Sequence, residues 1–230
     1  TCALPIFAEY ANTNAYSLPW DTKPKFPGYV NGVYQQGYTN SVVGLNPKQA
    51  GIWRYDKHHL VPFGEFIPLK SVFGWIYRDW LNMPLSDLSR GSYEQKPMLM
   101  AGQKIAVNIC YEDVFGEEII RQLPEATLLV NASNDAWYGR SNAAEQHLQF
   151  SQMRALETGR MVLRATNTGA TAVISNKGDV LATVPQFTTV ILNGTVQGYT
   201  GSTPYIRWGN WAIISLLFIA LILLWGRKKK

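Results

Sequence analysis

Residues 104–113 read KIAVNICYED, and this stretch decides the class of fold that the sequence predicts. The apolar, β-branched run ahead of Cys110 is typical of a buried strand, and the acidic residues after it are typical of the first turn of a helix. Cys110 is therefore predicted to lie at a strand-to-helix junction. A helix N-terminus lowers the pKa of a thiol and offers N–H groups to an oxyanion, so this junction suits a nucleophile. Composition alone would favour an inert core cysteine.

A nucleophilic thiolate at this position needs a positive neighbour, because Glu112 and Asp113 follow it directly and disfavour another negative charge. Lys57 is the candidate. It closes the strand-like stretch 52–57, and the ends of neighbouring strands converge on one rim of a sheet. The sequence therefore predicts that Lys57 and Cys110 meet at such a rim.

Apolar runs and helical patterns alternate along the middle of the chain. Helices are predicted at 114–123 and 142–160, the second with Asn142 as N-cap and Glu145 completing a capping box. The runs rich in β-branched residues predict strands at 40–45, 52–57, 104–110, 127–132, 162–166, 170–175, 180–184 and 190–196. This alternation predicts a layered α/β sandwich.

Three further stretches carry local signals. Residues 176–179 (NKGD) predict a hairpin turn in which Gly178 adopts a positive φ. Residues 10–37, rich in Asn, Pro, Gly and Tyr, predict a long loop or insertion. Residues 71–81 (SVFGWIYRDWL) are helix-like and strongly apolar, which fits either core packing or an arm in the outer leaflet of a membrane.

The C-terminal stretch 211–226 reads WAIISLLFIALILLWG and is followed at once by RKKK. As a helix it would be roughly 24 Å long, somewhat short of a hydrocarbon core of about 30 Å. Its flanks favour a transmembrane helix all the same, because interfacial aromatics and snorkelling cations extend a short span. The tryptophans in question are Trp208, Trp211 and Trp225. The basic tail 227–230 is expected in the cytoplasm, which places residues 1–210 on the opposite side.

Composition excludes several classes of protein. The formal charge is +5, and the tail 227–230 supplies four of these charges, which leaves +1 (5 − 4) for the rest of the chain. No basic surface for nucleic acid is therefore expected. Two cysteines exclude a scaffold of several disulfides. The start TCALP lacks both methionine and signal-peptide character, so the chain is expected to begin inside a longer protein.

Three segments in order resemble the successive signatures of the nitrilase superfamily, which has the carbon-nitrogen hydrolase fold. They are 55–65 (YDKHHLVPFGE), 108–112 (NICYE) and 133–139 (SNDAWYG). Among the branches of this superfamily they look most like the apolipoprotein N-acyltransferases of the bacterial inner membrane. The resemblance covers about residues 38–230.

The resemblance implies a four-layer αββα sandwich, present here in part, and a Glu-Lys-Cys triad. Lys57 matches the lysine of the triad and Cys110 the cysteine. Glu65 matches a glutamate that supports the site, and Tyr111 and Glu112 match the residues that flank the nucleophile. The triad glutamate, the general base, has no match in this chain.

The same resemblance divides the chain into a nitrilase-like catalytic domain at 1–200 whose N-terminal part is missing, a linker at 201–210, the transmembrane helix at 211–226 and the cytoplasmic tail at 227–230. It places the catalytic domain on the periplasmic side of the bacterial inner membrane.

The implied reaction moves an acyl chain from a membrane phospholipid to the thiol of Cys110, and from this thioester to the N-terminal amine of a diacylglyceryl-cysteine apolipoprotein. No metal and no organic cofactor is implied. The chain by itself is expected to be inactive, because the general base has no match in it.

Two other functions stay open at this stage. A nitrilase-type amidase or hydrolase would use the same triad with water as acyl acceptor. A catalytically silent, membrane-tethered binding module would account for the missing glutamate. The retained pair of Lys57 and Cys110 favours an enzyme.

Other conspicuous residues receive simpler interpretations. Trp137, in a loop after a predicted strand, is expected to line a pocket. His147 is expected on a helix surface, and Glu157 and Arg160 are expected to form an i,i+3 surface pair. His58 and His59 are adjacent and lack ligand spacing, so no metal site is expected.

Overall fold

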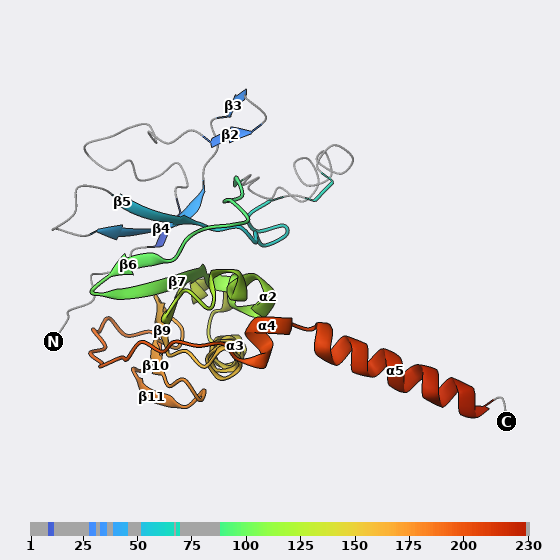
Figure 1. The fold of residues 1–230 in the computed structure, drawn as a ribbon. Coiled ribbons are helices and arrows are strands. Elements are labelled where there is room, and N and C mark those ends of the chain that lie inside the picture. The colour runs from blue at the N-terminus through green and yellow to red at the C-terminus, as the bar shows by residue number, and fades with distance from the viewer. Residues whose placement is uncertain are drawn as a thin grey trace.

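The computed structural model of the chain describes residues 9–11, 28–30, 33–35, 39–45, 52–66, 68–69 and 88–228. Within them the strands form a six-stranded sheet, a three-stranded sheet and a two-stranded hairpin (Figure 1). The six-stranded sheet has the order β11-β10-β9-β8-β7-β6, with β6 at Met98–Met100, β7 at Gln103–Ile109, β8 at Leu128–Ser133, β9 at Val162–Thr166, β10 at Ala172–Ile174 and β11 at Val180–Thr183. The three-stranded sheet has the order β1 (Glu9–Ala11), β4 (Asn40–Leu45), β5 (Ile52–Asp56), and the hairpin pairs β2 (Gly28–Val30) with β3 (Val33–Gln35).

The centre of the larger sheet is parallel. Strands β7, β8 and β9 run in one direction, with Asn108 opposite Asn131 and Asn131 opposite Arg164. The outer strands β6, β10 and β11 pair antiparallel with their neighbours. Parallel strands end at one edge of a sheet, so the residues after β7 and β8 are placed side by side.

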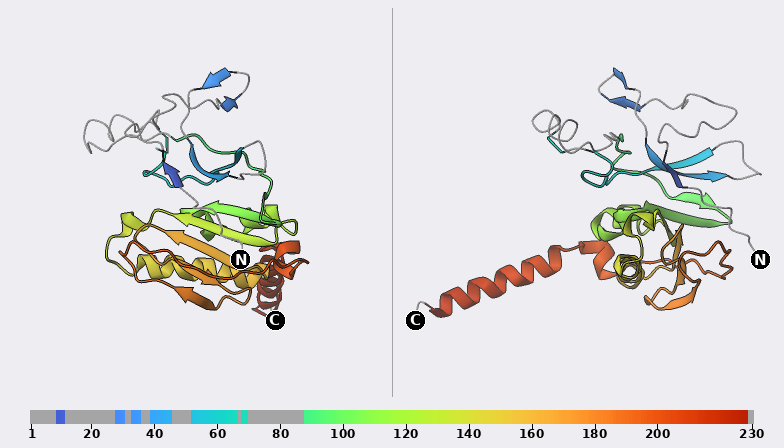
Figure 2. Two further views of the ribbon diagram at one scale, coloured as in Figure 1. Left: turned by 90° about the vertical axis from the view of Figure 1, so that its left-hand side faces the viewer. Right: turned by 180° about the vertical axis from the view of Figure 1, so that it is seen from behind.

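Two apolar layers hold the fold together. One lies between the sheets and joins Val42 and Tyr55 to alternate residues of β7 and β8. The other lies between the six-stranded sheet and the helices α2 (Gly116–Ile119), α3 (Ala143–Thr158) and α4 (Pro204–Trp208). Strands whose residues alternate between two buried faces are typical of a central sheet. The described layers are therefore β, β and α, which confirms the predicted α/β class (Figure 2).

Gly44 on β4 packs tightly against Met98 on β6 of the other sheet. A Cβ atom at this position would collide with the Sδ atom of Met98 on β6. Met98 is fully buried, so its side chain has no free space to move into. The absence of a side chain at Gly44 is what allows the sheets to pack face to face here.

Most predicted strands occur, and two have the predicted bounds, at 40–45 and 162–166. The hairpin turn is also confirmed, with Gly178 at φ 88° and its N–H donating to the Ser175 carbonyl at 3.0 Å. The predicted strand at 190–196 is wrong. This segment packs Leu192 and Val196 against the core between the sheets without joining a sheet. Strand β6, by contrast, was not predicted.

The helix predictions need two corrections. The stretch 114–123 is not one helix, because Phe115 has φ −98° and ψ 79° and separates the 3-10 helix η2 (Cys110–Val114) from α2 and from η3 (Ile120–Gln122). The capping box of α3 is also absent, since the Asn142 side chain makes no capping hydrogen bond. The Ser141 hydroxyl accepts the Ala143 N–H instead, at 3.3 Å.

Two predicted segments lie largely or wholly outside the described residues. Of the predicted loop 10–37, the described parts form the end of β1 and the β2–β3 hairpin, so it is not loop throughout. The apolar stretch 71–81 lies outside the described residues.

The predicted linker 201–210 contains helix α4, whose Ile206 is buried and whose N-cap Thr203 accepts the Ile206 N–H.

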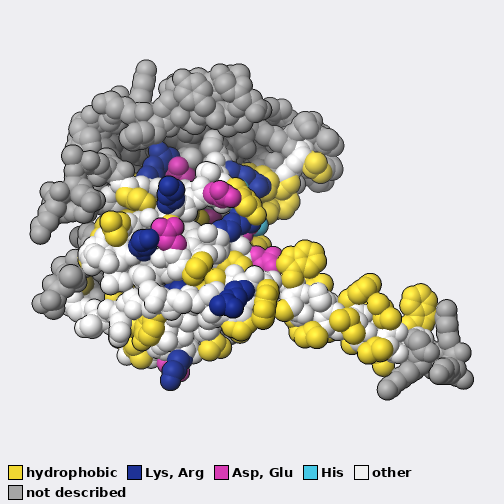
Figure 3. Space-filling view, viewed as in Figure 1, with side chains coloured by type: hydrophobic (Ala, Val, Ile, Leu, Met, Phe, Trp, Pro, Cys, Tyr) yellow, Lys and Arg dark blue, Asp and Glu magenta, His cyan; other side chains and the backbone are white. Residues whose placement is uncertain are grey.

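Helix α5 (Trp211–Lys228) covers the predicted transmembrane segment 211–226 and projects from the domain (Figure 2). Its side chains from 211 to 225 are all exposed, and apolar groups line its visible face (Figure 3). Among the described residues, no helix combines the length and the apolarity that crossing a membrane requires. The predicted helix is thus confirmed, whereas the prediction that it crosses a membrane is not.

Candidate active site

Cys110 follows β7 directly and opens η2, as the junction in the sequence predicted. Its φ is 52°, in the left-handed region that a residue with a side chain occupies only when its surroundings hold it there. The side chain is partly exposed. Because η2 is a five-residue 3-10 helix, its dipole is a weaker source of thiolate stabilisation than the predicted α-helix.

Lys57 follows β5, which belongs to the three-stranded sheet, whereas β7 belongs to the six-stranded sheet. The prediction that Lys57 and Cys110 share the rim of one sheet is therefore wrong. Face-to-face packing of two sheets brings the two strand ends to one end of the sandwich. Lys57 is 1% exposed, so its ammonium group is buried.

Glu65 is the partner of this buried ammonium group. Its Oε1 atom lies 2.8 Å from Lys57 Nζ and accepts the Asn40 amide at 3.1 Å. Its Oε2 atom accepts the Val61 N–H at 2.8 Å. A buried cation needs such a partner, and Glu65 supplies it.

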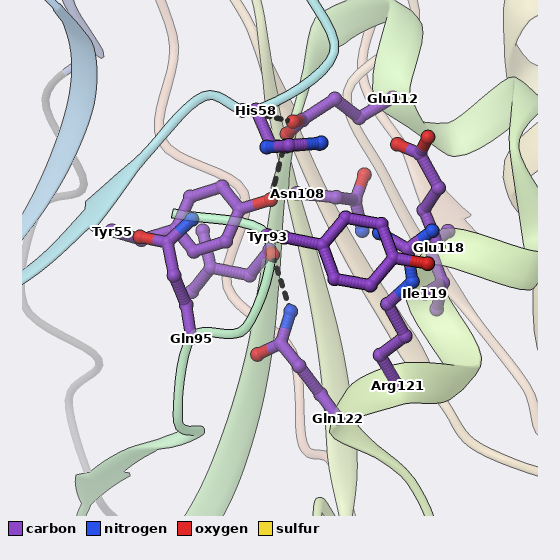
Figure 4. A pocket seen from close by; sticks show the side chains of 11 residues that line it. Tyr55, His58, Tyr93, Gln95, Asn108, Glu112, Glu118, Ile119, Arg121 and Gln122 are labelled. Atoms are coloured by element: carbon purple, nitrogen blue, oxygen red, sulfur yellow. Dashed lines mark hydrogen bonds between the residues drawn. The ribbon is translucent and has the colours of Figure 1, made fainter. Parts of the chain in front are cut away.

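Glu112 connects the two strand ends. One oxygen of its carboxylate accepts the N–H groups of His58 and His59, at 2.7 and 3.0 Å. The other accepts the Ile109 N–H at 2.7 Å and the Tyr55 hydroxyl at 3.0 Å (Figure 4). The carboxylate thus binds the backbone just after Lys57 and just before Cys110. We call these contacts the Glu112 clamp.

The clamp is buried, and this affects both of its titrating members. Burial raises the pKa of Glu112, opposed by the His59, Ile109 and His58 N–H groups and by the charge of Lys57. Burial beside the Glu112 carboxylate also raises the pKa of Tyr55 well above 10, so this phenol keeps its proton and donates it to the clamp. The charge of Lys57 thus lowers the pKa of a residue in the turn that Cys110 opens.

A small pocket lies behind the clamp (Figure 4). Its wall includes Tyr55, His58, Tyr93 and Arg121, and the Arg121 guanidinium lies 3.2 Å from the centroid of the Tyr93 ring. Among the described residues, its lining contains neither Lys57 nor Cys110. The pocket therefore adjoins the clamp and not the proposed reacting groups.

The remaining predicted site residues lie on the outer side of the turn. Tyr111 is partly exposed and packs edge-to-face on Phe115, with ring centroids 5.0 Å apart. Trp137 is 79% exposed, so it lines no enclosed pocket in the described structure. Its neighbour Tyr138 lies closer to the site: burial first, and then the charge of Cys110, raise the pKa of Tyr138 to about 12.

The sequence interpretation missed His147. It is 3% exposed rather than on a helix surface, and its Nε2 atom lies 3.2 Å from the carbonyl oxygen of Cys110. The buried face of α3 gives the signal that could have found it: Ala144, His147, Leu148, Ser151, Ala155 and Thr158. Their helical spacing marks one stripe, and His147 is part of it.

The predicted surface pair of Glu157 and Arg160 is also wrong. Arg160 is 2% exposed and donates to backbone carbonyl groups, among them those of Ala126 at 2.9 Å and Gly201 at 2.7 Å. Glu157 pairs with Arg154 instead, at 3.0 Å. Gly159, which lies between Glu157 and Arg160 and has a left-handed conformation, ends α3. Arg160 therefore no longer follows the helical period.

Comparisons with known proteins bear on this geometry. The family described as "Carbon-nitrogen hydrolase" matches residues 25–205. A Nitrosomonas europaea protein named apolipoprotein N-acyltransferase is 60% identical over 200 residues, which are 84% of this chain and 39% of that protein. A Chromobacterium violaceum protein of the same name is 50% identical over 198 residues, which are 84% of this chain and 38% of that protein. The chain thus spans less than half the length of these relatives.

Among solved structures, a carbon-nitrogen hydrolase from Helicobacter pylori matches with a TM-score of 0.47 and 16% identity, over 69% of this chain and 56% of that one. The family match at 25–205 takes in Lys57, Glu65, Cys110 and Glu112, and extends over more than half of the chain. The chain belongs to the carbon-nitrogen hydrolase family.

Proposed function

We propose that this chain carries the nucleophile-bearing part of an apolipoprotein N-acyltransferase. Cys110 is the nucleophile, and Lys57 stabilises the negative charge that develops beside it. The observation that carries the proposal is the Glu112 clamp, which binds the backbone just after Lys57 and just before Cys110. The name shared by relatives 50–60% identical to this chain supports the substrate class.

The first half-reaction forms a thioester. The thiol proton of Cys110 passes to a general base, which the resemblance assigns to a glutamate without a match in this chain. The thiolate attacks the ester carbonyl carbon of a phospholipid, forming a C–S bond. The Lys57 ammonium group and the Tyr111 N–H then stabilise the tetrahedral oxyanion. The C–O bond breaks, and the lysophospholipid oxygen leaves with the proton held by the base.

The second half-reaction transfers the acyl group to nitrogen. The free α-amine of a diacylglyceryl-cysteine apolipoprotein attacks the thioester carbonyl, and an amide C–N bond replaces the C–S bond. The amine loses a proton to the base, and the thiolate of Cys110 is regenerated. The steps use no metal and no organic cofactor.

The supporting residues serve this chemistry indirectly. Glu65 keeps the buried ammonium group of Lys57 paired and oriented through a 2.8 Å contact. Glu112 fixes the peptide that leads into Cys110. Trp137, which is exposed on η4 (Asp135–Tyr138) after β8, is proposed to contact the lipid or lipoprotein rather than an enclosed pocket.

The test is mass spectrometry of the complete protein incubated with phospholipid and no acceptor. The acyl mass is expected on the peptide that contains Cys110, and hydroxylamine, which cleaves thioesters, is expected to remove it. Cys110→Ala should abolish the adduct, and Cys110→Ser should nearly abolish it, because a serine hydroxyl is far harder to deprotonate. Acylation of another residue would overturn the proposal.

A matched pair of lysine variants tests the role of charge. Lys57→Met is expected to remove acylation, whereas Lys104→Met, at an exposed lysine paired with Glu125, should leave it unchanged.

Adding a diacylglyceryl peptide to the acylated protein tests whether an amine or water accepts the acyl group. Recovery of the fatty acid in the peptide supports the transferase, whereas its release to water alone would identify a hydrolase.

We further propose that α5 anchors the domain at the bacterial inner membrane, with the catalytic residues on the periplasmic side. A helix that is apolar all round needs to be buried against protein or lipid, and the side chains from 211 to 225 are all exposed. Tryptophans at its two ends suit the membrane interface, and the cations that follow favour the cytoplasmic side.

Protease treatment of spheroplasts tests this orientation. Digestion of the domain, with protection of a tag placed after Lys230, is the expected result. The reverse pattern, with the tag cut and the domain protected, would exclude periplasmic lipoprotein acylation.

A further inference from the structure

A buried cluster of charged side chains lies beneath the Cys110 turn and has no part in the proposed chemistry. We call it the charge ring. Its members are Asp113 from η2, Asp135 from η4 (Asp135–Tyr138), His147 from α3 and Arg164 from β9. All four are 3% exposed or less. Burying so many charges is costly unless each is paired, so their mutual geometry is informative.

The contacts require that His147 carry two protons. Its Nδ1 atom lies 3.1 Å from the Asp135 carboxylate and its Nε2 atom 3.0 Å from the Asp113 carboxylate. An ionised carboxylate only accepts hydrogen bonds, so each ring nitrogen must donate. His147 is therefore an imidazolium. Burial alone would lower its pKa, but the hydrogen bonds that it donates to Asp113 and Asp135 raise it to about 9.

The ring is electrically balanced only with this proton in place. The Arg164 guanidinium contacts Asp113 at 3.1 Å and Asp135 at 3.2 Å, so each acid touches both cations. Two negative and two positive charges alternate around the ring. Loss of the imidazolium proton would leave two buried carboxylates facing one guanidinium.

The ring reaches Cys110 through the backbone. The carbonyl oxygen of Cys110 accepts the Asn131 amide at 3.1 Å and lies 3.2 Å from Nε2 of His147. Arg164 in turn holds the Asn131 side chain at 2.8 Å. The positive φ of Cys110 is an unfavourable conformation that surrounding contacts must maintain, and the contacts at its carbonyl group are among them.

We propose that His147, as an imidazolium, is a positioning residue that holds the Cys110 peptide in its left-handed conformation, and that loss of its proton at alkaline pH lowers the reactivity of the Cys110 thiolate. This inference rests on the proposed role of Cys110 as nucleophile. His147 itself does not touch the substrate.

The charged groups that contact His147 all belong to the charge ring. Asp113, Asp135 and Arg164 face it from η2, η4 and β9, and the ring of Tyr138 lies edge-on at 5.9 Å. On its own helix, Ser151 donates to Asp113 at 2.7 Å. Strand β10 contributes the apolar segment Ala172–Ile174.

The experiment measures alkylation of Cys110 by iodoacetamide in the complete protein, followed peptide by peptide with mass spectrometry between about pH 6 and pH 10.5. In the unaltered protein the rate should rise as the thiol ionises and fall as His147 loses its proton near pH 9. His147→Gln should lower the rate about 10- to 100-fold below pH 9, where His147 carries its proton, as expected for a displaced reacting group, and the two rates should converge above pH 9.

A double variant separates charge balance from shape. His147→Gln with Asp135→Asn leaves one carboxylate facing Arg164, which restores neutrality without a titrating group. We expect a partial recovery of the rate and no alkaline fall. Glu145→Gln, an exposed change on the same helix, is the matched control and should behave as the unaltered protein. Circular dichroism of each variant reports whether it folds.

Two results would overturn the inference: an unaltered rate profile in folded His147→Gln, or an alkaline fall that persists in the double variant. Acylation by phospholipid, measured on the same samples, keeps the two proposals apart. A Cys110 that shows the His147-dependent alkylation profile but is never acylated would refute the proposed function and leave the positioning role of His147 standing.

Discussion

At the scale of single residues, two glutamates stabilise different parts of the candidate site. Glu112 binds the backbone N–H groups just after Lys57 and just before Cys110, and Glu65 neutralises Lys57. Lys57 is a buried cation, and the proposed function gives it a chemical task besides this structural one.

Separating these two tasks gives a first prediction. Lys57→Met should lower the free energy of unfolding by about 3 kcal/mol, because it leaves the Glu65 carboxylate without its cation. Lys57→Met with Glu65→Gln should recover most of this stability, because no buried charge is then left unpaired. Denaturant unfolding measures both. Acylation of Cys110 should stay absent in the double variant, and its return would show that Lys57 acts on stability alone.

The charge ring predicts how stability depends on pH. The pKa of His147 is raised from 6.5 to about 9 in the folded protein, so the proton is bound more tightly there than in the unfolded chain. The resulting stabilisation, up to about 3 kcal/mol, is fully present below pH 6.5 and is lost as pH rises through 9. Thermal unfolding at about pH 6, 7.5 and 9 measures it. His147→Gln should remove this pH dependence, and an unchanged slope would contradict the assignment.

At the scale of elements, Gly44 of β4 and Met98 of β6 pack tightly against each other across the two sheets. Gly44→Ala should lower stability by about 1–3 kcal/mol, because the new methyl group overlaps the buried Met98 side chain. Met98→Val shortens that side chain and should offset part of the loss. Denaturant unfolding of both single variants and of the double variant gives the coupling energy. Strict additivity would show that the two residues do not meet.

At the scale of the whole molecule, the matched relatives are more than twice as long as this chain, which spans 39% of the Nitrosomonas europaea protein. The resemblance assigns the general base to a residue without a match here, so residues 1–230 alone should not acylate Cys110. A hybrid that carries residues 25–230 in place of the corresponding part of that relative should regain acylation. Turnover by residues 1–230 alone would mean that Glu65 or another carboxylate of this chain acts as base.

The sequence by itself determined the local part of this structure. The apolar, β-branched run ahead of Cys110 predicted β7 and the junction after it, and Gly178 predicted the hairpin turn. Such signals lie within a few residues of one another, so short-range sterics and periodicity suffice to interpret them. The motifs around Lys57 and Cys110 also identified the family before any contact was known.

Only the tertiary structure decided which distant residues meet. Lys57 and Cys110 come from two sheets, and the prediction of one shared rim failed because strand patterns do not say which sheet a strand joins. His147 was expected on a helix surface, and its burial depends on Asp113 and Asp135, which are 34 and 12 residues away in the chain. A buried charge is stable only with its partners in place, and those partners are assembled by the packing of whole elements.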